Sequence, residues 1–344
     1  MNNLDVEIGV AKHSSFQKNT EKIIKVNRTI KNLGYGEQDH PVRYFFSALS
    51  ELSNKDYFKS ILMKILEKRP NITEEHLAYL IYISLQYLTD FDYDKENQKG
   101  KIEKDLIRYS DKIIKLCQTN YASTNVIERY AFMQIILAIV NKPSTVIDLG
   151  ASIGLGLMSL NTDSSHIDMD SSLKHYMIKK ANVSKAIGID IQKPDLKWQL
   201  ACYLPESMKN RLELENVYKK LKSRGTKISL IKGSVLELDK VKLKADVIWT
   251  SNMLYEVEGD LNKVFRDIKS ILNTGGIWIN ADYRYDNKPF ATKENPYVAM
   301  VRIKENWDEV FEVLEAPSDI VRIVKQGKDF EKFIDACEQI PTIC

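Results

Sequence analysis

The sequence predicts an α/β fold. An all-helical N-terminal domain is expected over residues 1–141, and a domain with a mostly parallel sheet and helices on both faces over residues 142–344. Three observations predict this organisation. Apolar residues recur at three- and four-residue steps between positions 41 and 140, which is a helical period. After Pro143, short runs rich in β-branched residues alternate with helical segments, as in parallel sheets. The length of 344 residues suffices for two domains.

The N-terminal helices are predicted from apolar spacing and from residues that start or end helices. Pro70 ends one helical run, and Asn71 or Thr73 is expected to cap the next helix. The expected order is a weak helix around 16–30, a loop over 32–41, helices between 41 and 66, a helix over 74–88, a charged loop over 90–101, and helices over 102–118 and 124–141.

The strands of the second domain are predicted where β-branched residues cluster between helical segments. The expected strands cover residues 145–148, 186–190, 228–231, 246–249 and 276–280. Ligands of such sheets bind at the carboxyl ends of the strands, so the turns that follow these runs are the places to search for function.

Composition excludes several classes of protein. Lys and Arg total 50 against 47 for Asp and Glu, so a formal charge of +3 gives no electrostatic case for nucleic acid as an obligatory partner. The start of the chain does not resemble a signal peptide, and the most apolar stretch, 130–140, is too short to cross a bilayer. The four cysteines have no metal-ligand spacing. We therefore expect a cytoplasmic protein without a membrane partner or a bound metal.

The turn after the first expected strand carries the clearest functional signal. Asp148 ends that strand, and Gly150, Ser152 and Gly154 follow it before a helix begins. Gly150 permits a tight turn, Gly154 permits close approach of backbone or ligand, and Ser152 is expected to cap the helix. A cofactor is expected at this turn.

The spacing of the glycines and the acid distinguishes between two cofactors. Dinucleotide sites have the spacing GxGxxG, with backbone amides that face a pyrophosphate. Here the spacing is GxxxGxG, and Asp148 stands two residues before the first glycine. An anionic side chain repels phosphate but suits the ammonium and sulfonium of S-adenosylmethionine. The charge pattern favours this methyl donor over NAD.

A second acid, Asp190, ends the next expected strand, where a carboxylate can accept hydrogen bonds from both ribose hydroxyls. It lies farther from Gly150 than the usual spacing of about 20 residues, which indicates an insertion around 161–182. The insertion contains two histidines and two aspartates, but in no recognisable ligand spacing. We expect a flexible polar hairpin there in preference to a metal site. The side chains that such a metal site would use are His166, His175, Asp168 and Asp170.

These acids and glycines, with the segment 245–257 around the fourth strand, resemble the class I S-adenosylmethionine-dependent methyltransferases over about 143–290. Within that superfamily the chain looks most like an uncharacterised bacterial branch defined only as a domain of unknown function. That narrower resemblance spans nearly the whole chain. It rests on residues 150–155, 188–190, Pro194, Asp195, Trp198, Pro205, Glu206, Thr124, Asn125 and Arg129.

The resemblance implies a Rossmann-like sheet and a set of residues that contact S-adenosylmethionine. Two departures affect that set: Ser152 stands where glycine is frequent, and Ser234 where an aspartate commonly contacts the adenine amino group. The implied contacts are Asp148, Gly150, Ala151, Ser152, Gly154, Asp190, Ile191, Ser234, Val235, Ser251 and Arg129.

The resemblance also places the loop after the fourth strand beside the transferred methyl group. Asn252 is expected to hold an acceptor, Tyr255 to wall the site or orient the donor, and Glu256 to act as a base if burial raises its pKa. The alternative is that Tyr255 and Glu256 belong to the first turn of an ordinary packed helix. Secondary candidates after the fifth strand are Asp282, Tyr283 and Tyr285.

Arg129 and Asn125 are one helical turn apart. Arg129 could bind the carboxylate of the cofactor or that of a substrate. Asn125 could equally be a helix N-cap, with Glu128 completing a capping-box-like pair.

The primary hypothesis is a methyltransferase that holds its acceptor between the helical domain and the fourth-strand loop. A small molecule is slightly favoured as acceptor over protein or RNA. Two alternatives stay open: a non-catalytic protein that kept the fold, and an NAD-dependent oxidoreductase. The sequence predicts no oligomeric state.

Overall fold

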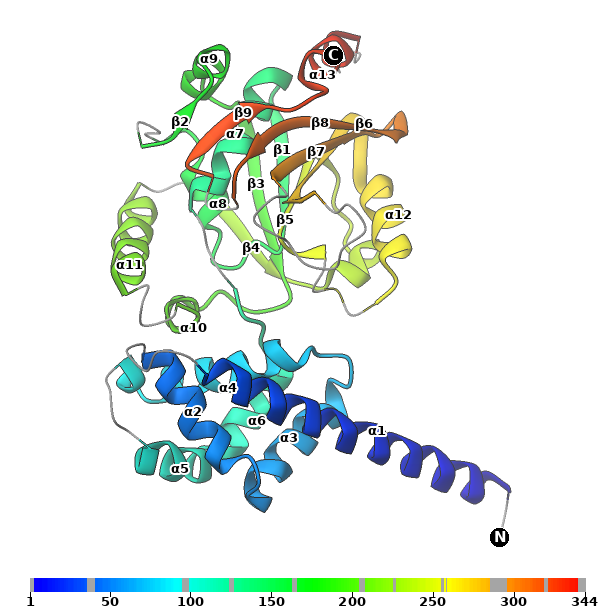
Figure 1. Ribbon diagram of the computed structural model, residues 1–344. Coiled ribbons are helices and arrows are strands. Elements are labelled where there is room, and N and C mark those ends of the chain that lie inside the picture. The colour runs from blue at the N-terminus through cyan, green and yellow to red at the C-terminus, as the bar shows by residue number, and fades with distance from the viewer. Residues whose placement is uncertain are drawn as a thin grey trace. The chain divides into compact units, whose positions relative to one another are not determined.

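The computed structural model describes residues 3–35, 41–94, 99–123, 127–162, 166–203, 208–224, 227–254, 257, 259–284, 296–318 and 321–339 (Figure 1). The chain forms two compact units. Unit 1 comprises residues 1–124 and 196–215, and unit 2 comprises 125–195 and 216–344. None of the helices in the described ranges combines the length with the apolar composition that a bilayer crossing requires.

The division between the units differs from the boundary expected at 141. Helix α7 (Tyr130–Val140) packs into the core of the sheet unit, because nearly all of its side chains are buried there. Residues 196–215, which lie between two strands of the sheet in sequence, fold instead with unit 1. Trp198, Ala201 and Cys202 are buried in the helical core of that unit.

The described elements of unit 1 are helices. Thr73 caps α4 by accepting a hydrogen bond from His76 N at 3.2 Å, which decides between the two capping residues that the sequence offered. The region expected as one helix over 102–118 is broken at Tyr109, whose backbone (φ −108°, ψ 12°) departs from helical values. The helices are α1 (Asn3–Leu33), α2 (Pro41–Leu52), α3 (Asp56–Lys68), α4 (Glu74–Leu88), η1 (Asp92–Asp94), α5 (Lys99–Arg108), α6 (Ser110–Thr119) and α10 (Leu196–Ala201); α11 (Met208–Ser223) begins in unit 1 and ends in unit 2.

Unit 2 is built on a nine-stranded sheet of order β2-β9-β8-β7-β6-β5-β1-β3-β4. Five adjacent strands, from β4 through β3, β1 and β5 to β6, are parallel, and β7, β8 and β9 extend them with antiparallel pairing. The strands are β1 (Ser144–Leu149), β2 (Asp168–Met169), β3 (Val183–Asp190), β4 (Ile228–Lys232), β5 (Ala245–Ser251), β6 (Leu272–Tyr283), β7 (Tyr297–Ile303), β8 (Asn306–Ala316) and β9 (Ile323–Gln326).

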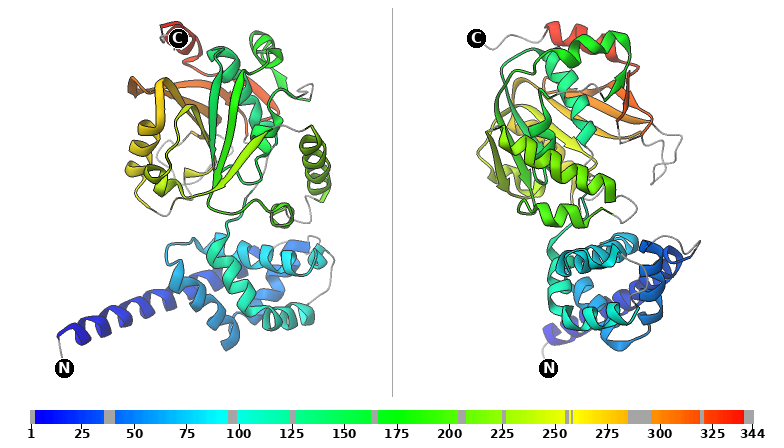
Figure 2. Two further views of the ribbon diagram at one scale, coloured as in Figure 1. Left: turned by 180° about the vertical axis from the view of Figure 1, so that it is seen from behind. Right: turned by 90° about the vertical axis from the view of Figure 1, so that its left-hand side faces the viewer.

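Helices cover both faces of the parallel strands (Figure 2), and the side chains of β1 alternate between the two faces. Val146 packs on one side with α7 and α13 (Phe330–Gln339). Ile147 and Leu149 pack on the other side with α12 (Leu261–Ile271). Because successive side chains of a strand point to opposite faces, a strand buried on both sides reads as a continuous apolar run. The apolar runs of β1, β3, β5 and β6 could be predicted from the sequence for this reason, whereas β4 is mostly exposed at the edge of the sheet.

The insertion after the first turn is folded, contrary to the flexible hairpin expected from its polarity. Strand β2 pairs in parallel with β9, and Leu173 and Met177 are buried. Asn161 is hydrogen-bonded to Gln134 of α7 and to both backbone groups of Ala181, so the base of the insertion is closed. Among the described residues, no group of three or more His, Cys, Asp or Glu side chains is arranged to hold a metal ion.

Candidate functional site

The site lies where the order of the strands reverses. From β1 the chain proceeds to β3 and β4 on one side of β1, and then crosses to β5 and β6 on the other side. At such a switch point, the connections that leave neighbouring strands diverge and a ligand crevice opens at their carboxyl ends. The residues expected to bind the cofactor stand at the ends of β1, β3, β4 and β5.

The turn after β1 depends on left-handed backbone conformations. Gly150 and Gly154 have φ values of 79° and 80°, which glycine adopts without a Cβ penalty. A Cβ on Gly150 would lie 2.8 Å from Met253 Cγ, so the loop after β5 packs directly on this turn. A short helix, α8 (Leu155–Ser159), begins after Gly154. The absence of a side chain at Gly150 therefore lets the loop after β5 pack on the turn after β1.

Ser152 has a different role from the one expected. The N-cap position of α8 is Gly154, without a side-chain hydrogen bond, so the prediction that Ser152 caps this helix is wrong. Its backbone is left-handed (φ 53°), which lets the amide of Ser152 donate to Asp190 Oδ2 at 2.8 Å. The Oγ atom is buried without a hydrogen-bond partner among the described residues. A buried hydroxyl left without a partner is costly, and it marks a place where a ligand can bind.

Asp190 is held in one orientation by two backbone amides. Ser152 N donates to Oδ2 and Gln192 N donates to Oδ1, both at 2.8 Å. Burial raises the pKa of Asp190, and these two hydrogen bonds act in the opposite direction. Each carboxylate oxygen retains a free lone pair, because a carboxylate accepts about four hydrogen bonds. Asp190 is therefore an oriented acceptor with capacity for two ligand hydroxyls.

Asp148 is more deeply buried, with 5% of its surface exposed. Its Oδ2 would lie 3.5 Å from a Cβ placed on Gly156, so the carboxyl group lies against the first turn of α8. Burial raises its pKa well above the usual range, and the nearby charge of Asp190 raises it further. No hydrogen bond joins its carboxyl oxygens to the described residues. From the sequence alone Asp148 is expected to be anionic; its burial in the folded chain instead favours the neutral, protonated form.

The segment after β4 is hydrogen-bonded to the backbone of Asp190. Gly233 N donates to Asp190 O at 2.8 Å, so Ser234 follows next to the second acid. Ser234 caps the short helix η5 (Val235–Lys240) by accepting from Leu236 N at 3.2 Å. Ile191, immediately after Asp190, is 43% exposed although it is apolar. Ser234 and Ile191 thus flank Asp190, and Val235 is half-buried beside them.

The loop after β5 is held by Tyr297, a residue that sequence reasoning missed. Asn252 is left-handed (φ 47°), and its amide donates to Ala281 O at 3.1 Å. The hydroxyl of Tyr297 donates to the same carbonyl at 3.0 Å and lies 2.8 Å from Ser251 Oγ. Tyr297 thus fixes the base of this loop. Tyr255 and Glu256, the other residues expected there, lie outside the described residues.

Arg129 is brought to the same place. It is 8% exposed, and its guanidinium lies 5.8 Å from the centre of the fully buried Tyr297 ring. Of the secondary candidates, Asp282 is 3% exposed and Tyr283 contacts the Tyr297 ring edge-on. Thr124, Asn125 and Tyr285 lie outside the described residues. No short local pattern identifies Tyr297, because it reaches the loop through the pairing of β6 with β7.

Neither family models nor curated proteins give a match to the sequence. A comparison with solved structures does give matches, each over less than half of this chain. They include PKMT2 from Rickettsia typhi in complex with AdoHcy (16% identity, 48% of this chain and 28% of that chain, TM-score 0.30). Two others are the N-methyltransferase NodS from Bradyrhizobium japonicum in complex with S-adenosyl-L-homocysteine (15%, 46% and 64%, TM-score 0.29) and TehB from Haemophilus influenzae (15%, 47% and 47%, TM-score 0.28). The chain spans less than two thirds of each of these proteins. The narrower bacterial branch stays a prediction.

Proposed function

We propose that the chain binds S-adenosylmethionine at the carboxyl ends of β1, β3 and β4 and transfers its methyl group to an acceptor at the loop after β5. One observation carries the proposal. The buried acid Asp148 and the half-buried acid Asp190 lie at the carboxyl ends of adjacent parallel strands, and the turn after β1 donates an amide to Asp190. A ligand with a cationic portion and a ribose satisfies both acids.

The cationic portion suits Asp148. A buried carboxyl group that makes no hydrogen bond to the described residues is best satisfied by a positive group, which would also return its pKa toward normal. The ammonium of a methionine moiety is such a group. The buried Ser152 hydroxyl, which lacks a partner among the described residues, adds a donor or acceptor on the same turn.

The backbone of the turn argues against a dinucleotide. Anion-binding turns direct free amides at phosphate. Here the amides of Gly150 and Ala151 donate to Ile189 O, at 2.8 and 3.3 Å, and that of Gly154 donates to Ala151 O at 2.7 Å. The amide of Ser152 is used by Asp190. Four amides of the turn are therefore already engaged, and the charged side chains beside it, Asp148 and Asp190, are acids, which disfavours the NAD alternative.

The other residues take roles consistent with that placement. Asp190 would accept bonds from the ribose hydroxyls, Ile191 and Val235 would contact the base, and Ser234 would reach its polar edge. Arg129 stays a candidate for a carboxylate of either cofactor or substrate. A bound sulfonium supplies an activated methyl group, which is transferred by in-line displacement. The chain's part is to align the acceptor and exclude water, with Ser251 and Asn252 nearest by their place after β5.

Three earlier predictions stay as proposals. Tyr255 and Glu256 remain candidates for orienting the donor and for removing a proton from the acceptor. A small molecule stays slightly favoured as acceptor, and the helical unit stays a proposed substrate domain. A non-catalytic relative that kept the fold is the remaining alternative, since Ser152 and Ser234 both depart from the pattern of the superfamily.

Calorimetric titration with S-adenosylhomocysteine and S-adenosylmethionine tests the proposal, with NADH as the competing ligand. The two adenosyl ligands should bind, NADH should not, and Asp190→Ala should abolish binding. Glu237→Gln is the matched control, because Glu237 is an exposed acid of the same unit whose side chain pairs with Lys240. Absence of heat at high micromolar ligand would contradict the proposal. Binding that survives Asp190→Ala, without methyl transfer, would favour the non-catalytic alternative.

A further inference from the structure

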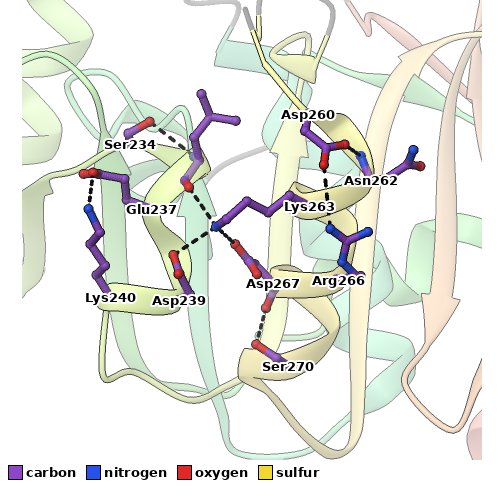
Figure 3. A network of polar contacts seen from close by, with 11 residues as sticks. Ser234, Glu237, Asp239, Lys240, Asp260, Asn262, Lys263, Arg266, Asp267 and Ser270 are labelled. Atoms are coloured by element: carbon purple, nitrogen blue, oxygen red, sulfur yellow. Dashed lines mark hydrogen bonds and ion pairs between the residues drawn. The ribbon is translucent and has the colours of Figure 1, made fainter.

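A network of charged side chains joins η5 to α12 on the surface of unit 2 (Figure 3). The network contains two kinds of contact. Lys240 pairs with Glu237 within η5, and Arg266 pairs with Asp260 at the start of α12, so both of these are local. Lys263 alone among the cations drawn in this network connects the two helices.

The ammonium of Lys263 uses all three of its donors. It donates to Leu236 O at 2.9 Å, to Asp239 Oδ1 at 3.0 Å and to Asp267 Oδ2 at 2.5 Å. An ammonium has three hydrogens, so its capacity is fully used. The lysine projects from α12, whose inner face is buried against the sheet through Val264 and Ile268. The donor is therefore mounted on a rigid element.

The carbonyl that Lys263 holds belongs to a residue already bonded to the candidate site. Leu236 N donates to Ser234 Oγ, while Leu236 O accepts from Lys263. The Leu236 side chain also packs on Gly259, where an added Cβ would come within 2.7 Å of Leu236 Cδ2. One residue thus connects α12 to Ser234 through two hydrogen bonds.

The segment 233–236 needs this support, because its own helix is irregular. Glu237, immediately after Leu236, has non-helical angles (φ −123°, ψ 22°), so η5 is kinked at that point. At its other end the segment is fixed by Gly233 N, which donates to Asp190 O. Without the lysine, the segment would keep the packing of Leu236 on Gly259 but would lose its hydrogen bond to α12.

We propose that Lys263 is a positioning residue, which fixes Ser234 and Val235 beside Asp190 so that they contact the nucleoside part of the ligand. This inference rests on the proposed function. In this proposal Lys263, a surface residue of α12, contributes to the affinity for the nucleoside part of the ligand. It does not contribute to the affinity for the amino-acid part.

The test compares Lys263→Met with Lys240→Met. Lys240 is the matched control, since it pairs with an acid of the same short helix but does not contact Leu236. Calorimetric titrations use S-adenosylhomocysteine and 5′-methylthioadenosine, which lacks the amino-acid part. Lys263→Met should weaken both ligands by about tenfold, a usual size for a lost connection between neighbouring groups, and Lys240→Met should leave both unchanged.

Three further comparisons separate a positioning role of Lys263 from general stabilisation of the fold. The double variant Asp239→Asn with Asp267→Asn keeps the bond from Lys263 to Leu236 O, so it should bind both ligands like the wild type even where it melts lower. In a Ser234→Ala background, the effect of Lys263→Met should shrink, because the two changes act on the same contact. Lys263→Arg should restore part of the affinity.

The outcomes are distinct. If the wild-type chain does not bind S-adenosylhomocysteine, the proposed function fails. If the wild type binds and Lys263→Met binds equally well, or if Lys263→Met weakens S-adenosylhomocysteine but not 5′-methylthioadenosine, the positioning role is overturned while the proposed function stands. A full, additive loss in the Ser234→Ala background would also overturn it.

Discussion

The two halves of the sheet differ in where they place their polar residues. In the parallel half, the buried Asp148 and the half-buried Asp190 lie at the carboxyl ends of β1 and β3, and the turn after β1 contains three left-handed residues within five positions. In the antiparallel half, the partly buried Glu312 pairs with Arg284 and with the exposed Lys328. Parallel strands all end at one edge, so their turns gather there, whereas successive antiparallel strands end at opposite edges. The direction of the strands, more than their composition, concentrates the site.

Tyr297 is a residue of the antiparallel half that nevertheless contacts the site. It begins β7, an antiparallel strand, yet its hydroxyl fixes the loop after β5. The antiparallel half therefore contributes a hydroxyl group that supports the loop after β5. Substitutions in the two halves should separate stability from ligand binding.

The largest effect on stability is expected when a closely packed glycine of either half of the sheet is replaced by alanine. A Cβ on Gly188 would lie 2.6 Å from Leu230 Cδ2 and 2.7 Å from Ala151 Cβ, and one on Gly327 would lie 2.2 Å from Glu312 O. Gly188→Ala and Gly327→Ala should each lower the free energy of unfolding by about 2–4 kcal/mol, measured by urea denaturation. Only Gly188→Ala should also weaken S-adenosylhomocysteine, because Ala151 belongs to the cofactor turn. Equal loss of binding in both variants would refute the functional division of the sheet.

A smaller effect is expected at Asp148. Its folded pKa is raised by burial and by Asp190, so between the unfolded and folded pKa values the native state holds a proton that the unfolded state has lost. The ligand-free protein should therefore lose stability as pH rises through the folded pKa, and Asp148→Asn should remove that dependence. Urea denaturation at a series of pH values measures it.

The same substitution should weaken ligand binding by about tenfold or more, since a buried ion pair is lost. Cofactor binding should release a proton from Asp148 in the wild type, so the calorimetric heat should vary with the ionisation enthalpy of the buffer. Asp148→Asn should abolish that variation. A wild-type heat that is independent of the buffer would show that Asp148 is already ionised, contrary to its burial.

The smallest effect is expected at Tyr297. Tyr297→Phe keeps the ring against Phe132 but removes the hydroxyl bonded to Ala281 O and Ser251. We expect a loss of about 1 kcal/mol of stability and a lower rate of methyl transfer with little change in cofactor affinity. Tyr176→Phe in α9 (Lys174–Ile178), whose ring contacts Phe330, is the control. An unchanged rate of methyl transfer for Tyr297→Phe would show that the antiparallel half does not support the site.

Much of the parallel half could be predicted because its signals are local. The run before Asp148 is buried on both faces, and the glycines that follow it adopt the left-handed conformations that the turn needs. The antiparallel strands carry apolar and β-branched residues too, as in 297–303, but their pairing partners are far away or follow a long connection. Ser152 was assigned to the wrong hydrogen bond, since the position of Asp190 beside its amide depends on the pairing of β1 with β3.

The amino-acid sequence alone was enough to predict the alternation of strands and helices, an acid followed by a glycine-bearing turn, and a second acid at the next strand end. These features follow from residue chemistry and periodicity over a few positions. Only the tertiary structure decided that Asp148 is a buried acid whose charge depends on its neighbours, that residues 196–215 fold with the helical unit, and that Tyr297 and Lys263 reach the loops of the site. Burial and contacts between distant segments arise only when the chain has folded, so no local pattern encodes them.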